Sequence, residues 1–255
     1  MSSMPITVPS RLSQTFSVQL LLAETNETFS LPQCQNDLTM KRLKSHLELL
    51  TGIPVHFQRL QYLDAVDLPD ESTFEDNDVV PGGTITMRIW QQDGWGRLVA
   101  AAARGDTAEL VQLGVTEAAA GTAPYAAFLG PQQRKAWVAH RAFVALFVAC
   151  HRGHLETAKF LLRHGADLHS KTPQGRTALH AAAVTGQCDC LELLLRFGAQ
   201  ARSTDSEGQS ALSLAEQWGQ RRGRRAMLSF QPQRRPRGPG PTASAAQTRP
   251  GPRTH

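Results

Sequence analysis

The pattern of apolar and polar positions divides the chain into two parts with different periods. Residues 16–20 alternate apolar and polar side chains, as a half-buried β-strand does, and residues 28–31 follow after the turn-like sequence at 24–27. These segments predict a β-hairpin. Two further strands are predicted at residues 59–63 and 84–89.

A helix is predicted between the hairpin and the third strand. Thr39 is suited to cap its first turn, and Gly52-Ile53-Pro54 ends it. Helical spacing places four apolar side chains on one face: Met40, Leu43, Leu47 and Leu50.

This segment, residues 14–91, resembles ubiquitin in the order and spacing of its motifs. The resemblance is carried by Gly52-Ile53-Pro54, Gln58-Arg59-Leu60, Leu68, Thr73-Phe74, Asp78 and residues 84–89. It implies an α+β β-grasp domain that docks to proteins of the ubiquitin pathway. Two departures change that expectation. No Gly-Gly pair follows the last strand, so conjugation is not expected, and Gln61 and Arg88 stand where ubiquitin has apolar surface residues.

An internal repeat follows. Residues 175–182 recur at 208–215, an offset of 33 residues, and residues 144–149 fit one period earlier. A further unit begins at Asp93, and about fifteen residues more than the repeat period separate it from the next unit. Each unit predicts two short helices, the first with a small apolar face and the second with leucines at helical spacing, which are buried only when neighbouring units stack.

The repeats resemble the ankyrin repeat, through the residues Gly175, Thr177, Leu179, His180, Gly186, Gly198 and Gly208. The resemblance implies an all-α solenoid of about four units over residues 93–230. In that family Thr177 and His180 would tie one unit to the next by hydrogen bonds. The insert at residues 115–133 departs from the family spacing, and we expect a loop there with a short helix from Pro131.

Ankyrin-like stacks generally bind proteins through the tips of their hairpins and their concave helix face, without a cofactor. The tips are predicted at residues 169–174 and 202–207. The candidate partner-binding residues are His169, Ser170, Lys171, Gln174, Arg202, Asp205 and Glu207.

The net charge of +5 arises in the C-terminal segment. Residues 219–255 contain nine Arg and no Asp, Glu or Lys, so the other 18 basic residues are fewer than the 22 acidic ones. Residues 231–255 are rich in Pro, Gly, Ser, Thr and Arg, which predicts a disordered basic tail, and residues 1–13 are also expected to be disordered. Arg221–Arg225 suits nuclear import or nucleic-acid contact, but no aromatic residue follows Phe230 to stack on bases, so nucleic acid is not expected as the main partner.

Cys150, His151 and His154 are potential zinc ligands, as are Cys188 and Cys190. We favour the interpretation that these cysteines and histidines pack between repeats, as small apolar and polar side chains. His180 has no Ser or Cys nucleophile paired to it in a known pattern, and no phosphate-binding loop or nucleophile elbow occurs. We therefore expect no enzyme, no cofactor, no metal and no small-molecule substrate.

The chain is expected to lie in the cytoplasm or nucleus, with no signal peptide, transmembrane segment or disulfide framework. The leading hypothesis is a non-enzymatic adaptor, in which the repeats bind a partner protein. The N-terminal domain either docks the chain onto ubiquitin-pathway proteins or packs against the first repeat as a cap. The alternative is a nuclear regulator, in which the repeats bind a transcription factor and the arginine-rich tail serves import or nucleic-acid contact.

Overall fold

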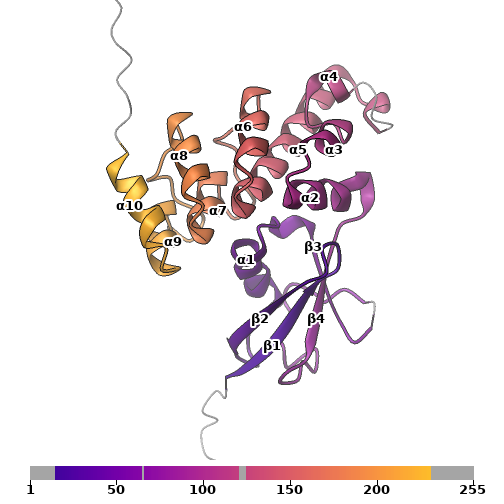
Figure 1. Ribbon diagram of the computed structural model, residues 1–255. Helices are drawn as coiled ribbons and strands as arrows, with labels where there is room; N and C mark the ends of the chain where they lie inside the picture. Colours follow the sequence, from indigo (N-terminus) through magenta and orange to yellow (C-terminus); the bar gives the residue numbers. More distant parts are fainter. Residues whose placement is uncertain (1–14, 65, 121–124, 231–255) are drawn as a thin grey trace, which may run out of the picture.

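The computed structural model describes residues 15–64, 66–120 and 125–230 (Figure 1). The predictions of disorder for residues 1–13 and 231–255 therefore lie outside the described residues, as does part of the insert. The described chain is an α+β unit followed by a row of helix pairs. This confirms the predicted order of an α+β domain followed by an all-α part.

The N-terminal unit is built on a mixed four-stranded sheet. Strands β1 (Phe16–Leu22) and β2 (Glu27–Cys34) form the predicted hairpin, and β3 (Gln58–Tyr62) and β4 (Thr84–Ile89) occupy the other two predicted positions. The sheet order is β2-β1-β4-β3, with β1 parallel to β4 and both other pairs antiparallel. The alternation seen in the sequence has its physical cause here, because every second side chain of β1 from Val18 onward is buried.

Helix α1 (Met40–Thr51) covers one face of this sheet. Its N-cap is Thr39, whose hydroxyl accepts a hydrogen bond from the Arg42 amide at 3.3 Å, and Gly52 ends the helix with a φ of 77°. Met40, Leu43 and Leu47 are buried, as their spacing predicts. The one-turn helix η1 (Val55–Phe57) follows and leads into β3.

The C-terminal unit consists of four helix pairs. They are α2 (Trp95–Arg104) with α3 (Thr107–Gln112), α5 (Pro131–Arg152) with α6 (Leu155–Arg163), α7 (Ala178–Thr185) with α8 (Cys188–Arg196), and α9 (Ala211–Gln217) with α10 (Arg221–Ser229). The first helices of the pairs pack in the row α2-α5-α7-α9. The one-turn helix η2 (Gln92–Gly94) joins this row to β4.

The insert differs from the expected loop with a short helix. It contains α4 (Glu117–Ala120) and the one-turn helix η3 (Tyr125–Phe128), and the helix that begins at Pro131 is α5, which continues for 22 residues into the second pair. No Gly or Pro interrupts the chain between Pro131 and Gly153, so nothing ends this helix before the Gly153 cap.

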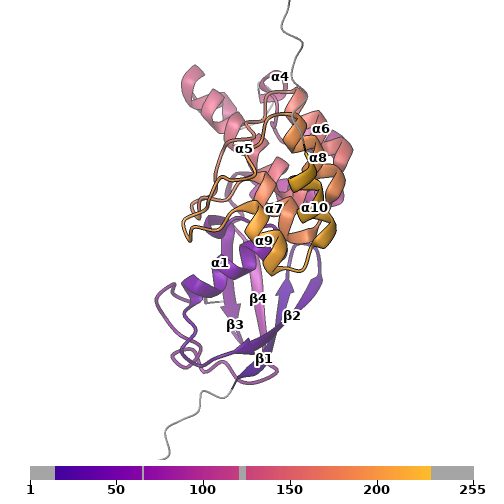
Figure 2. The same cartoon turned by 90° about the vertical axis from the view of Figure 1, so that its left-hand side faces the viewer.

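The two units share one apolar core. Buried side chains from the sheet, from α1 and from the helix pairs form a continuous cluster. Both views show α1 lying between the sheet and the row of first helices (Figures 1 and 2). Within the described residues, no helix has the length and apolar character needed to cross a membrane.

Candidate functional site on the inner surface of the repeats

The inner surface of the repeats is the surface formed by α5, α7 and α9 and by the loops that precede α7 and α9. Repeat proteins of this kind present such a surface to partners, and here α1 lies against it (Figure 2). The contacts are made by a second face of α1, which carries Ser45, Glu48 and Leu49, all buried. The helix therefore packs on the sheet with one face and on the repeats with the other.

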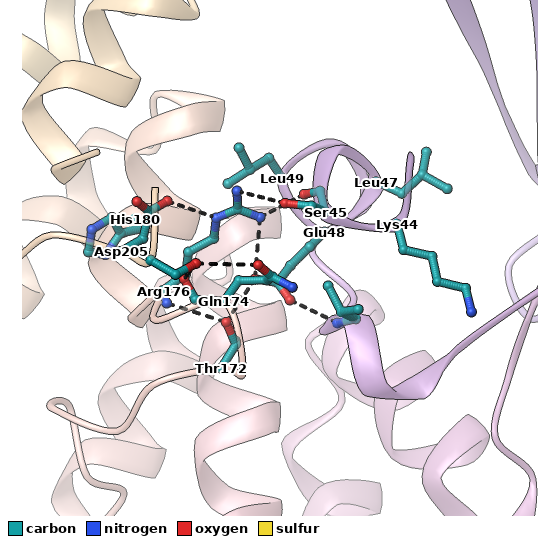
Figure 3. A network of polar contacts seen from close by, with 12 residues as sticks. Lys44, Ser45, Leu47, Glu48, Leu49, Thr172, Gln174, Arg176, His180 and Asp205 are labelled. Carbon is teal, nitrogen blue, oxygen red and sulfur yellow. Dashed lines mark hydrogen bonds and ion pairs between the residues drawn. The ribbon is translucent and has the colours of Figure 1, made fainter. Parts of the chain in front are cut away.

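Arg176 is the centre of the polar contacts between the two units. It lies in the loop before α7, and only 1% of its surface is exposed. Its guanidinium donates to the Ser45 carbonyl oxygen at 2.6 Å and to the Ser45 hydroxyl at 3.2 Å. On its other side it donates to the Asp205 carboxylate at 3.2 Å (Figure 3). One side chain thus joins α1 to two successive repeat loops.

Glu48 is the acidic partner of Arg176 on α1. One carboxylate oxygen lies 3.5 Å from the guanidinium of Arg176 and accepts a hydrogen bond from the Thr172 hydroxyl at 2.8 Å. The other oxygen accepts from the Val55 amide at 2.8 Å. Burial raises the pKa of Glu48, and the hydrogen bonds and the nearby guanidinium oppose that effect. Every oxygen of this buried carboxylate has a partner, as a buried charge requires.

His151, at the end of α5, makes a second polar contact with the N-terminal unit. Its Nε2 atom lies 2.8 Å from the carbonyl oxygen of Leu49. The imidazole also fills the space beside Gly52, where an added Cβ would stand 2.5 Å from the His151 Cγ atom. Burial lowers the pKa of His151 to about 4, so the ring is neutral near pH 7. The sequence favoured a histidine packed between repeats over a zinc ligand at this position, and the ring packs instead against the end of α1.

Arg152 adds an ion pair at the edge of the same interface. It donates two hydrogen bonds to the Glu27 carboxylate, at 2.5 and 2.7 Å. Burial alone would raise the pKa of Glu27, but these hydrogen bonds and the guanidinium charge outweigh it, and the pKa lies below its ordinary value. The bidentate geometry orients the start of β2 against the end of α5.

Apolar and aromatic contacts complete the interface. Leu49 packs with Val184 of α7 and Leu214 of α9 in a cluster separate from the main core. His46 stacks on Trp218, with ring centroids 5.6 Å apart, and Phe57 lies against Trp95 at 4.4 Å. The contacts therefore extend from α2 to the end of α9.

The predicted partner-binding residues are divided by this arrangement. His169, Lys171 and Arg202 are exposed, and Ser170 and Gln174 are half-buried. Asp205 is buried and accepts hydrogen bonds from Arg176 and from two backbone amides, those of Glu207 and Gln209. The Glu207 carboxylate is exposed but accepts a hydrogen bond from Ser45 at 3.1 Å. Two of the seven predicted residues thus contact the chain's own interface network.

Thr177 and His180 contact each other at the start of α7, and His180 also faces the next unit, where it interacts with the backbone of Ser203 and Gln209. The Nδ1 atom of His180 accepts from the Thr177 amide at 3.1 Å and lies 2.9 Å from the Thr177 hydroxyl, which caps the start of α7. Burial lowers the pKa of His180, and the nearby Asp205 opposes that shift. A further link to the next unit is made by neighbouring residues, since the Ser206 amide and hydroxyl both donate to the Gln174 carbonyl oxygen at 2.9 Å.

The other candidate metal ligands do not gather at one site, although Cys150 and Cys190 lie against each other. His154 points to the Ala103 carbonyl oxygen at 2.7 Å, and the Cys188 thiol donates to the Gly186 carbonyl oxygen. A hydrogen bond to Cys190, together with burial, raises the pKa of Cys150 well above its ordinary value. In residues 15–64, 66–120 and 125–230, no three His, Cys, Asp or Glu side chains are arranged to hold a metal ion.

Comparison with known families identifies part of the chain. Residues 141–233 match the model for ankyrin repeats, with three copies. Three ankyrin repeats are supported there, and they indicate a protein–protein interaction module. The matched span begins within α5, so the first helix pair, the insert and the sheet domain lie outside it. No curated protein matches the chain.

Sequence reasoning missed the pair at the centre of the interface. Arg176 lies inside the repeat motif of residues 175–182 and Glu48 inside the predicted helix, but the sequence pattern assigns neither residue a role. A signal was present on the helix, because Leu49 is an apolar residue outside the face that packs on the sheet. A helix with apolar side chains on two faces indicates two packing partners.

Proposed function

We propose that the chain is a non-enzymatic adaptor whose ankyrin repeats bind a partner protein at their hairpin tips, while a ubiquitin-like N-terminal domain covers their inner surface. The role of the repeats in binding a protein rests on the family match of residues 141–233. The covering role of the N-terminal domain rests on the docking of α1, through Glu48 and Arg176, on the surface that ankyrin repeats commonly offer to other proteins.

The ubiquitin-like assignment is supported by topology. The hairpin, the helix and the two later strands follow the order that the sequence predicted, and β1 and β4 form a parallel pair at the centre of the sheet. The domain is an integral part of this chain, since the backbone continues from β4 through η2 into α2, and β4 therefore has no free carboxyl end for conjugation. The positions of Gln61 and Arg88 give β3 and β4 polar side chains where ubiquitin has apolar ones.

A covering role for this domain is supported by the extent and polarity of its contacts. The interface buries Arg176 and Glu48, which have partners in both units, and this holds the two units in one orientation. A partner protein that bound the inner surface would have to displace α1 and expose Arg176 and Glu48. The hairpin tips around Lys171 and Arg202 are reached without any such change, because these side chains are exposed.

The tip proposal is tested by affinity purification from lysate with quantitative mass spectrometry. The bait is the full-length chain, with Lys171→Glu and Arg202→Glu combined to reverse two exposed tip charges. A matched double variant, Arg163→Glu with Arg196→Glu, makes the same change of charge on α6 and α8. We expect the tip variant to lose partners that the wild type and the matched variant retain. Equal partner sets for all three baits would contradict the proposal.

The covering role is tested separately by amide hydrogen exchange of the full-length chain with a retained partner present. The proposal predicts that the amides of α1 and of the loop before α7 stay protected in the complex. Loss of protection at both places on partner binding would show that the partner takes the inner surface and that the N-terminal domain leaves it.

A further inference from the structure

The last helix of the stack, α10, presents an unusual outer face. Its inner side is packed closely, because an added Cβ at Gly223 would stand 3.0 Å from a methyl group of Leu191 on α8, and Met227 is buried. Figure 1 shows α10 at the end of the row of helices formed by the described residues. The outer side carries only exposed residues: Arg221, Arg222, Arg224, Arg225 and Leu228.

These residues are arranged around the leucine. At about 100° per residue, Arg221, Arg224, Arg225 and Leu228 fall within about 100° of one another on the helix surface, with Leu228 between Arg224 and Arg221. Leu228 is 62% exposed. We call this surface, made by Arg221, Arg224, Arg225 and Leu228, the α10 face.

The positive charge of the α10 face is hardly neutralised within the molecule. The helix contains no acidic residue, and Arg224 lies 3.6 Å from Glu216 in an exposed ion pair. Arg221 and Arg225 form no ion pair with any other part of the chain that the structure describes. A polar outer face keeps the end of a repeat stack soluble, which explains the arginines but leaves the exposed Leu228 unexplained.

We propose that the α10 face binds an acidic segment of a partner protein that carries an apolar residue among its carboxylates. Guanidinium groups pair with carboxylates through two parallel hydrogen bonds, and arginines are among the residues that contribute most of the binding energy at protein interfaces. Charge gives such a site its orientation and its association rate, and the leucine gives it a contact that charge alone does not supply.

Two other classes of partner fit the face less well. A nucleic acid would meet the arginines with its phosphates, but the α10 face has no aromatic side chain for a base, and Leu228 would gain nothing. A membrane surface attracts arginines, but a helix of nine residues with one exposed apolar side chain buries too little apolar area to lie in it. The α10 face is formed by other residues than the tips at 169–174 and 202–207, so it does not depend on the tip proposal.

The test uses the full-length chain and a fluorescein-labelled peptide of Glu-Glu-Leu repeats, with an all-Glu peptide of equal length as the second probe. Binding is followed by fluorescence anisotropy at physiological salt. The variants are Arg221→Gln with Arg225→Gln, and Leu228→Ser. The matched control is Arg163→Gln with Arg196→Gln, which removes the same charge from α6 and α8.

The proposal predicts that the Arg221/Arg225 variant binds the Glu-Glu-Leu peptide about tenfold more weakly, because each exposed ion pair contributes a factor of a few. Leu228→Ser should weaken that peptide but leave the all-Glu peptide unchanged, and the control should bind both as the wild type does. Equal weakening by the control would overturn the proposal, as would an unaffected Leu228→Ser variant. Tighter binding of duplex DNA or anionic vesicles, lost in the same Arg variant, would also overturn it.

Discussion

Replacing Arg176 with Met is the sharpest perturbation of the docked arrangement. Met keeps much of the apolar volume but removes three hydrogen bonds and the positive charge that stands 3.5 Å from Glu48 and 3.2 Å from Asp205. Both carboxylates keep two neutral donors each but lose the guanidinium group that faces them. Breaking a buried pair from one side costs about 3–5 kcal/mol.

The assay is urea unfolding of the full-length chain, followed by far-UV circular dichroism and by tryptophan fluorescence. Trp95 and Trp218 report directly on the interface, because their rings contact Phe57 and His46 of the N-terminal unit. The control is Arg196→Met, whose pair with Glu192 is exposed and contributes about 0.5 kcal/mol. Adding Glu48→Gln to Arg176→Met should restore part of the loss. A change below about 1 kcal/mol for Arg176→Met would refute the reasoning.

Three further predictions concern the same interface. His151, with its pKa lowered to about 4, stays neutral in the folded chain, whereas in the unfolded chain it takes up a proton near pH 6.5. Its contribution to the free energy of unfolding is therefore complete above pH 6.5 and falls by about 3 kcal/mol toward pH 4. The unfolding free energies of wild type and His151→Gln should therefore converge as the pH falls, and a constant difference between them would show the reasoning wrong. Gly52→Ala should cost more than Gly82→Ala, because both have φ near 78° but only Gly52 faces a side chain, His151, at 2.5 Å; equal melting temperatures would argue against that contact. Leu49→Ala should cost about 2–4 kcal/mol, whereas Leu63→Ala, at 90% exposure, should be neutral within about 0.5 kcal/mol in the same urea assay.

The local elements could be predicted because each depends on residues close together in the sequence. The hairpin followed from strand alternation, and the ends of α1, α7 and their neighbours followed from caps such as Thr39, Gly52 and Gly186. The buried leucines of α8, Leu191, Leu194 and Leu195, followed from helical spacing. The family match of residues 141–233 agrees with the repeat period.

The docking of the two units could not be predicted in the same way. Ser45 and Glu48 meet Arg176 across more than a hundred residues, and no periodicity relates them. The length of α5 was missed for a different reason: the insert was judged by its Ala, Gly and Pro content, although helix-forming residues continue unbroken after Pro131. The predicted partner site at Asp205 was placed on a loop correctly, but its side chain belongs to the network of Arg176.

Hydrogen exchange of the full-length chain, without a partner, measures most directly whether the N-terminal unit is held on the inner surface of the repeats. The docked arrangement predicts that the Val55 amide, which donates to Glu48, and the amides of α7 exchange with similar opening free energies, and that Arg176→Met lowers both together. Rapid exchange at Val55 with α7 still protected, unchanged by Arg176→Met, would contradict it and show that the two units open independently.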